Sequence, residues 1–277
     1  MIAYVVTGYG LNCEEETAHA YRAVGMEARI VHAQDLFAGD VSLTGASVVH
    51  LSGGFSFGDD LGSGKVFANR VRLERRPSGS TLLDELAAFV TDGGFLVGIC
   101  NGFQILVKSG ILPNVGQAHD LEVTLTHNDS GHFEDRWVRC RGLASPSPAF
   151  ADGDLLDLPV RHAEGKLVTR DARVREAILE KRLVALAYVD AELRPAHAYP
   201  ENPNGSELAC AGLTDPTGRV LGMMPHPEAF LLPHLHPGWA ERARAGALPE
   251  RGDGLSIFEN IARAADPQRR KKETSLS

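Results

Sequence analysis

The sequence is poor in cysteine and contains no closely spaced cysteine pair. Its four cysteines are Cys13, Cys100, Cys140 and Cys210. Without a C-x-x-C pair, the chain has neither the pattern of a zinc ribbon nor that of a dithiol redox motif. Widely spaced cysteines are typical of a thiol-reducing compartment, so we expect a cytoplasmic location.

Long apolar runs and an excess of positive charge are also missing. No stretch is long enough to cross a bilayer, and the N-terminus lacks the basic and apolar regions of a secretory signal. The formal net charge is −8, which does not favour a nucleic-acid-binding surface. We therefore expect neither a membrane nor a nucleic acid as a partner.

Internal repeats and a proline- or serine-rich linker are absent, so the sequence predicts a single domain over residues 1–265. With 277 residues, 43% of them hydrophobic, the chain can bury a sizeable core. Residues 266–277 contain the run RRKK, and we expect them to form a disordered basic tail. The Arg-rich segment 69–80 is expected to be a surface loop.

The first half of the chain alternates short apolar segments with amphipathic ones. This rhythm predicts an α/β fold, with a mostly parallel sheet and helices on both faces. After Pro113, short strands separated by loops predict antiparallel pairs added to that sheet. The expected strands are 2–7, 28–32, 47–51, 95–99, 121–125, 136–140, 166–168, 183–189 and 219–223, and the expected helices are 14–24, 82–91, 102–109 and 255–264.

The stretch Gly98-Ile-Cys-Asn-Gly102 carries the strongest chemical signature. It lies between an expected strand and an expected helix, and G-x-C-x-G is the nucleophile-elbow pattern with cysteine in place of serine. The two glycines leave room for a tight turn that strains the central residue. A helix N-terminus favours the thiolate of Cys100. Taken alone, the motif is also compatible with a buried cysteine beside packing glycines.

A cysteine nucleophile needs a base and a group that orients the base. His226 follows the expected strand 219–223, at the sheet edge where Cys100 should lie. Glu228 is two residues further on, and in an extended segment it would point the same way and fix the imidazole tautomer. The pattern predicts a Cys-His-Glu triad, with His162 as the next candidate base.

The glycine-rich loop Gly53-Gly-Phe-Ser-Phe-Gly-Asp59 follows another expected strand. A backbone N–H of Gly54 or Phe55 would pair with that of Asn101 to form an oxyanion hole. A phosphate-binding loop is the alternative, but no Gly-Lys-Ser/Thr follows at the required spacing.

Together these motifs resemble class I glutamine amidotransferases. More narrowly, Cys100–Gln104, Asn202–Ser206 and Gly222–Glu228 are similar to the glutaminase subunits of phosphoribosylformylglycinamidine synthases, and the resemblance extends from Met1 to about Ala264. It implies the flavodoxin-like fold of class I glutamine amidotransferases, with Cys100 as nucleophile, His226 as general acid/base and Glu228 as its orienting residue. One departure is the segment 162–165, where His-Ala-Glu-Gly replaces the family's His-Gly-Glu-Gly.

The resemblance also implies a substrate and partners. Glutamine would be hydrolysed through a cysteine thioester, with no metal or cofactor in this step, and the ammonia would pass to a synthetase subunit that binds ATP and Mg. A small bridging subunit is a further expected partner in this step of purine biosynthesis. The predicted substrate-binding residues are Gly53, Gln104, Asn128, Ser130 and Phe133.

Other functions remain open at this point. The chain could be the glutaminase of another amidotransferase or a cysteine hydrolase on a similar elbow. A redox-sensing module with a reactive thiol would not need His226 and Glu228.

Overall fold

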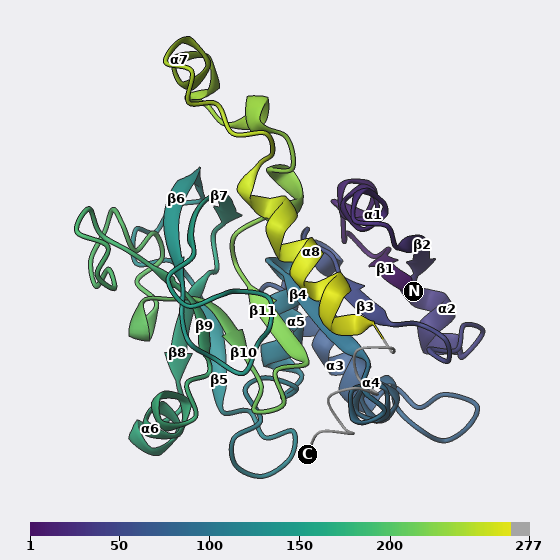
Figure 1. Cartoon of the computed structure of the whole chain (residues 1–277). Coiled ribbons are helices and arrows are strands. Elements are labelled where there is room, and N and C mark those ends of the chain that lie inside the picture. Colours follow the sequence, from purple (N-terminus) through teal and green to yellow (C-terminus); the bar gives the residue numbers. More distant parts are fainter. Residues whose placement is uncertain (267–277) are drawn as a thin grey trace, which may run out of the picture.

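A nine-stranded mixed sheet runs through the molecule in the order β2-β1-β3-β4-β11-β10-β9-β6-β7 (Figure 1). The computed structural model describes residues 1–266, so the predicted tail lies outside the described residues from Pro267 onward. The strands of this sheet are β1 (Ile2–Thr7), β2 (Glu27–His32), β3 (Val48–Leu51), β4 (Phe95–Ile99), β6 (Glu134–Gly142), β7 (Leu155–His162), β9 (Val184–Tyr188), β10 (Cys210–Thr214) and β11 (Val220–Met223).

The sheet has a parallel half and an antiparallel half. Strands β2, β1, β3, β4 and β11 are parallel to one another, whereas β11 and β10 and the strands that follow, β9, β6 and β7, are joined by antiparallel pairings. This confirms the predicted sheet with added antiparallel strands. Strands β5 (Val123–Thr126) and β8 (Lys166–Thr169) were also expected to join it, but they form a separate antiparallel pair.

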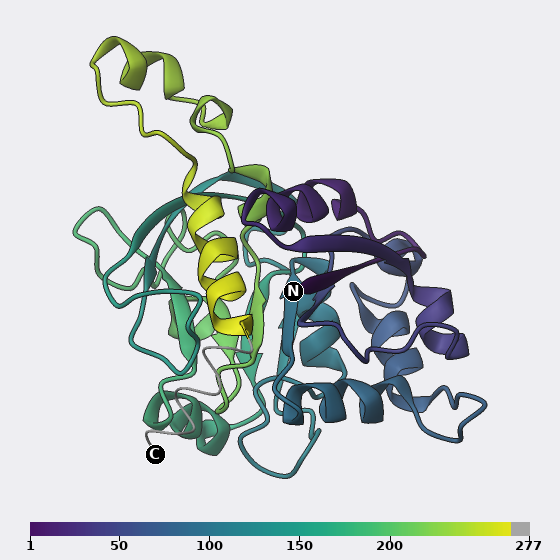
Figure 2. The same cartoon turned by 45° about the vertical axis from the view of Figure 1, so that its right-hand side comes forward.

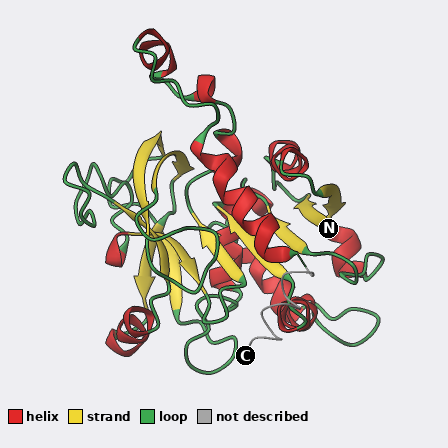
Figure 3. Ribbon diagram, in the orientation of Figure 1, coloured by secondary structure: helices red, strands yellow, loops and turns green. Residues whose placement is uncertain are grey.

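Helices cover both faces of the sheet, as predicted (Figures 2 and 3). Helix α8 packs against α1 on one face, and its buried stripe of Ile257, Phe258 and Ile261 has the spacing of a helix that faces a core. On the other face, α5 packs on β4 and α3 packs on α5. The helices are α1 (Glu14–Ala23), α2 (Ala33–Ala38), α3 (Lys65–Leu73), α4 (Leu82–Thr91), α5 (Asn101–Lys108), α6 (Ala172–Glu180), α7 (Trp239–Arg244) and α8 (Asp253–Ala265), with short 3₁₀ turns η1 (Ser56–Asp59), η2 (Glu207–Ala209), η3 (Pro227–Ala229) and η4 (Pro233–Leu235).

The prediction of a surface loop over 69–80 is wrong for its first part, because α3 extends to Leu73. Phe67, Ala68 and Val71 bury one face of this helix. Arg70 lies over the aromatic rings of Tyr9 and Phe37, so its long side chain covers apolar surface rather than projecting into solvent. In the sequence, the arginines thus obscure the apolar spacing of an amphipathic helix.

A second unpredicted feature is an arm that carries η4 and α7 away from the body of the molecule (Figures 1 and 2). Its base is pinned where the N–H groups of Gly252 and Gly254 donate to the carbonyls of Leu231 and Phe230. Among the helices of residues 1–266, none is long and apolar enough to cross a membrane.

Candidate active site

Cys100 lies in the tight turn between β4 and α5, at the carboxyl end of the parallel strands. Its backbone has φ 51° and ψ −104°, a conformation that residues with a side chain rarely adopt. A Cβ atom on Gly102 would lie 2.0 Å from the Leu51 carbonyl oxygen, and one on Gly98 would lie 2.6 Å from the Gly102 carbonyl. Only glycine fits at both positions, so the turn has the geometry of a nucleophile elbow.

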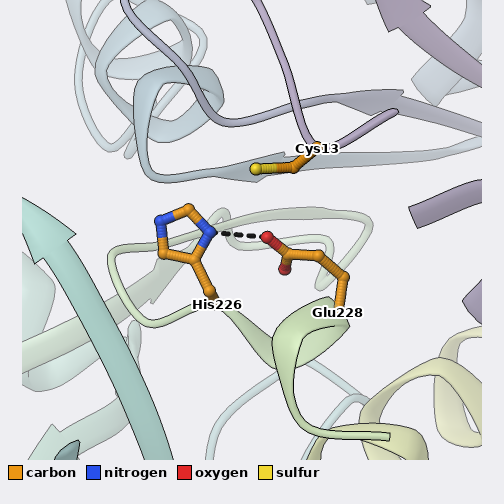
Figure 4. A group of neighbouring side chains, drawn as sticks. All are labelled: Cys13, His226 and Glu228. Atoms are coloured by element: carbon orange, nitrogen blue, oxygen red, sulfur yellow. Dashed lines mark hydrogen bonds and ion pairs between the residues drawn. The ribbon is translucent and has the colours of Figure 1, made fainter. Parts of the chain in front are cut away.

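His226 and Glu228 form a buried pair at the same edge of the sheet (Figure 4). His226 follows β11, and its Nδ1 lies 2.5 Å from Glu228 Oε1. The segment between them was expected to be extended, but Pro227 starts the 3₁₀ turn η3. The turn still brings the Glu228 carboxylate to the His226 imidazole, because the two residues are separated only by Pro227.

The electrostatics of this pair favour charge on both groups. Burial by itself would lower the pKa of His226, but the Glu228 carboxylate and the Cys100 thiol beside it raise that pKa well above its usual value. Burial would likewise raise the pKa of Glu228, yet the neighbouring imidazolium holds it below its usual range. His226 is therefore held as a cation that a thiolate or a carboxylate can stabilise.

Cys13 is a second thiol at this site, and no sequence motif pointed to it. It lies in the loop between β1 and α1, with its sulfur above the His226–Glu228 pair (Figure 4). A ligand atom from each of Cys13, His226 and Glu228 lies within 4.8 Å of the others. The one available signal was its place just after the first strand, because β1 is next to β3 and its carboxyl end reaches the same edge.

Strand β7 supports both reactive groups through its backbone. The Cys100 thiol donates to the Arg161 carbonyl at 3.5 Å, and the His226 N–H donates to the Pro159 carbonyl at 2.8 Å. Pro159 has no N–H to leave unpaired, which suits its place in the edge strand of the sheet.

The loop after β3 approaches Cys100 as expected for an oxyanion loop. The N–H of Phe55 donates to the Gly10 carbonyl at 2.9 Å and is therefore occupied. Within residues 1–266, neither the N–H of Gly54 nor that of Asn101 has a backbone acceptor, so these two are the better placed of the predicted donors. Gly53 permits the close approach, since a Cβ there would lie 2.9 Å from His226 Cε1.

Gln104 and Asn101 tie the elbow helix to its surroundings. The Asn101 side chain accepts from the N–H of Ser56 at 3.2 Å and donates to Gln104 Oε1 at 2.8 Å. Gln104 Nε2 donates in turn to the Glu164 carbonyl at 2.5 Å. This chain of bonds links the oxyanion loop to the segment 162–165.

Asn128 clamps that same segment. Its Nδ2 donates to the His162 carbonyl at 2.8 Å, and its Oδ1 accepts from the N–H of Gly165 at 3.0 Å. Burial, together with nearby His226, lowers the pKa of His162 to about 4, so His162 is neutral at pH 7. Ala163 adopts a negative φ, so the departure from the family's glycine leaves the loop unstrained.

The remaining predicted substrate-binding residues, Ser130 and Phe133, are more exposed than Gln104 and Asn128. The Ser130 hydroxyl accepts from the N–H of His132 at 3.3 Å. Phe133 is half exposed and faces the equally exposed Phe55, with ring centroids 6.1 Å apart. The two rings bring the segments around residues 55 and 133 together on the surface.

Comparison with known proteins identifies the class of enzyme. The profile of the CobB/CobQ-like glutamine amidotransferase domain matches residues 2–263, so the chain belongs to the glutamine amidotransferases. The curated PurQ subunit of phosphoribosylformylglycinamidine synthase from Dehalococcoides mccartyi is 40% identical over 92% of this chain and 94% of the relative. The PurQ subunit from Methanococcus maripaludis is 37% identical over the same shares. Within its class, the chain belongs to the PurQ family.

The structural comparison agrees with this assignment. A chain in the structure of PurLQS from Thermotoga maritima superposes with a TM-score of 0.67 and 28% identity, over 96% of this chain and 99% of that one. The expected family, enzyme class and fold are thus confirmed.

Proposed function

We propose that Cys100 is the nucleophile of a glutaminase reaction in this chain. Its thiolate attacks the carboxamide carbon of glutamine, and His226 gives its proton to the departing ammonia, which leaves a γ-glutamyl thioester. Water, deprotonated by His226, then attacks the thioester and releases glutamate and the Cys100 thiol. The N–H groups of Gly54 and Asn101 would stabilise both tetrahedral oxyanions.

The observation that carries this proposal is the buried His226–Glu228 pair beside the strained elbow. Either thiol could be the nucleophile by proximity alone, but their surroundings differ. Cys13 precedes the three carboxylates Glu14–Glu16, and its thiol already donates to Asn12 Oδ1 at 3.2 Å. Cys100 precedes a helix without acidic residues in its first turn.

The substrate side follows from the loops around Cys100. Gln104 and Asn128 hold the segment 162–165, which directly follows Arg161, whose carbonyl accepts from the Cys100 thiol. Phe55 follows the predicted donor Gly54, and its ring lies 6.1 Å from that of Phe133. We propose that Gly53, Gln104, Asn128, Ser130 and Phe133 form the glutamine-binding side of the site. In this arrangement Gln104 and Asn128 shape the pocket through the backbone that they anchor.

We propose that the ammonia is used by a separate synthetase subunit. The PurLQS structure from Thermotoga maritima supports an assembly with PurL and PurS, in which the larger partner would bind ATP and Mg and PurS would be the small bridging subunit. The glutaminase step itself needs no metal or cofactor. A cysteine nucleophile must stay reduced, which supports a cytoplasmic location.

We further propose that residues 1–265 fold as one domain. One continuous sheet contains strands from both halves of the chain, and α8 at the C-terminal end packs against α1 at the N-terminal end. Neither half would bury its apolar surface without the other.

The test uses the assembled complex with the Cys100→Ala variant. We expect it to form no amidine product with glutamine, but to form it with ammonium salt and ATP, because ammonia bypasses the missing nucleophile. Cys13→Ser is the matched control and should retain most glutamine-dependent activity. Glutamine-dependent activity in Cys100→Ala, or its loss in Cys13→Ser alone, would refute the assignment of the nucleophile.

A further inference from the structure

We propose that His50 is a positioning residue that donates a hydrogen bond to the Glu228 carboxylate through one buried water molecule. The inference deepens the proposed function, on which it rests, because it names what would hold that carboxylate in place beside His226. His50 would act through Glu228 and not on the substrate itself.

Helix α8 places His50 one helical turn below η3, the turn that carries Glu228. A Cβ on Gly254, in the first turn of α8, would lie 1.9 Å from the Pro227 carbonyl oxygen, so this end of the helix touches η3. Phe258 is four residues further along the same face, and its ring packs on that of His50 with centroids 6.3 Å apart. One turn of an α-helix advances about 5.4 Å, so the imidazole of His50 lies in the layer directly beneath η3.

Helix α1 gives the same placement independently. Cys13, at the start of α1, and Glu228 have ligand atoms within 4.8 Å of each other. Two turns later, the Tyr21 hydroxyl lies 3.0 Å from His50 Nδ1. Since the side chains of a helix lean toward its N-terminus, this hydroxyl reaches back toward Glu228. Both helices also pack against η3, so His50 lies behind the Glu228 carboxylate, between β3, α1 and α8.

Tyr21 determines which nitrogen of His50 carries the proton. Tyr21 is fully buried, and burial raises the pKa of its hydroxyl, which therefore keeps its proton. Within the described part of the chain, His50 Nδ1 is the one partner of that hydroxyl, so the hydroxyl must donate to it. Burial lowers the pKa of His50 to about 4, with the Glu228 carboxylate opposing the shift, so the imidazole is neutral at pH 7. Its single proton is then on Nε2.

Glu228 offers the acceptor that this proton lacks. His50 Nε2 and Glu228 Oε2 are both buried without a hydrogen-bond partner among residues 1–266. Glu228 binds His226 through Oε1, so Oε2 is the oxygen left free for a second donor. A buried donor and a buried acceptor in adjacent layers complement each other, because each is costly to leave unpaired.

Two hydroxyls beside these residues support a bridging water. Thr17 lies one turn before Tyr21 on α1, and Ser52 follows His50 by two residues at the end of β3. Both hydroxyls are buried and have no partner within the described residues. Since His50 and Glu228 form no direct hydrogen bond in this part of the chain, one water would join Nε2 to Oε2, with the hydroxyls as further partners. Buried waters typically make about three such bonds.

This hydrogen bond would have two effects on the reaction. A donor on Oε2 fixes the rotation of the Glu228 carboxylate, so that Oε1 stays directed at His226. It also stabilises the charged form of the carboxylate, which in turn holds His226 as the cation that protonates ammonia. Both effects concern the chemical step and not the binding of glutamine.

Kinetics of the assembled complex with glutamine test the positioning role. His50→Leu, which removes the donor, should lower kcat by about 10-fold or more with little change in KM, as expected for a lost hydrogen bond to a charged group. His50→Gln should retain most of kcat, because its amide N–H can replace the Nε2–H. Val48→Ala is the matched control, since it truncates a buried side chain on the same side of β3 but removes no donor.

Ammonium-dependent amidine formation should be unchanged in all three variants, which shows that each complex is assembled. An unchanged kcat in His50→Leu would overturn the proposal. A kcat for His50→Gln as low as that of His50→Leu would overturn it equally, because the side chain would then act through packing alone.

Heteronuclear NMR of the full chain with isotope-labelled histidine tests the hydrogen bond without any turnover. His50 should be neutral at pH 7 with its proton on Nε2. His50→Leu should shift the Nδ1 resonance of His226, whereas His50→Gln and Val48→Ala should leave it near its original position. A proton on His50 Nδ1, or a His226 resonance that does not respond to His50→Leu, would overturn the proposal. The expected spectra in a chain that hydrolyses no glutamine would leave the placement of His50 standing and refute only the proposed function.

Discussion

At the scale of single residues, the proposed glutaminase reaction depends on how the Glu228 carboxylate affects the pKa of His226. The carboxylate offsets the burial that would otherwise lower the pKa of the imidazole. Without that charge, the buried imidazole would lose its proton too readily to serve as an acid for the leaving ammonia. The pair therefore acts as one unit.

We expect His226→Gln to lower kcat/KM for glutamine by about 10²–10⁴-fold, the usual contribution of general acid–base catalysis. Glu228→Gln should cost less, because the glutamine side chain can still bond to the imidazole but carries no charge. Glutamate release measures both effects, and Glu241→Gln on the arm is the control. Turnover near the unaltered rate in His226→Gln would mean that another base acts, with His162 the first to examine.

Sequence alone could supply Cys100, His226 and Glu228, because each lies in a local pattern with a chemical reason. It could not supply Cys13, whose place beside His226 depends on β1 pairing next to β3. Nor could it show that the N–H of Phe55 donates a hydrogen bond to the Gly10 carbonyl. Both facts arise from the packing of loops that are distant in sequence.

At the scale of the elements, the strand–turn–helix unit around Cys100 leaves no room for a side chain at Gly98 or Gly102. Gly102 lies against the backbone of β3, so a side chain there must push β3 and α5 apart. The displacement would also move the N–H of Asn101 away from the oxyanion.

We expect Gly102→Ala to lower the free energy of unfolding by about 1–3 kcal/mol, the cost of overpacking, and to abolish glutaminase activity. Urea unfolding and glutamate release measure the two effects. Gly238→Ala is the control, since that arm glycine has φ −84° and its nearest neighbour would be 3.3 Å from the new Cβ. A stable and active Gly102→Ala chain would contradict the elbow geometry.

The parallel half of the sheet could be predicted because its strands are short apolar runs bounded by glycine. Strand β7 could not, since Asp157, Pro159 and Arg161 break its apolar pattern. Helix α3 was hidden in the same way by its arginines. In both cases tertiary contacts outweigh what the local sequence indicates.

At the scale of the whole molecule, buried neutral histidines link stability to pH. His50 on β3 is fully buried, with its Nδ1 3.0 Å from the Tyr21 hydroxyl. Burial, opposed only by nearby Glu228, lowers its pKa from 6.5 to about 4. Below pH 6.5 the unfolded chain therefore binds a proton at His50 that the folded chain does not bind. The free energy of unfolding must decrease as the pH falls from 6.5 to 4.

We expect the free energy of unfolding of the unaltered chain to fall by about 2 kcal/mol more than that of His50→Gln between pH 7 and pH 5. Only the change in the free energy of unfolding between the two pH values is compared. Any loss of stability that the substitution causes equally at both pH values therefore cancels. Urea unfolding at the two pH values measures it, with exposed His19→Gln as control. Equal changes in the unaltered chain and in His50→Gln would show that His50 is protonated in the folded state.

Strand β7 also sets the spacing of the two residues proposed as base and nucleophile. The carbonyl that accepts from His226 belongs to Pro159 and the one beside the Cys100 sulfur belongs to Arg161, two residues further along. Those carbonyls point to the same side of the strand, about 6.6 Å apart. The spacing between the His226 backbone and the Cys100 sulfur thus follows the two-residue repeat of an extended strand, because each is bonded to a carbonyl of β7. A residue inserted or deleted between Pro159 and Arg161 would turn one of the two carbonyls to the other side of the strand. Either His226 or Cys100 would then lose its hydrogen bond to β7.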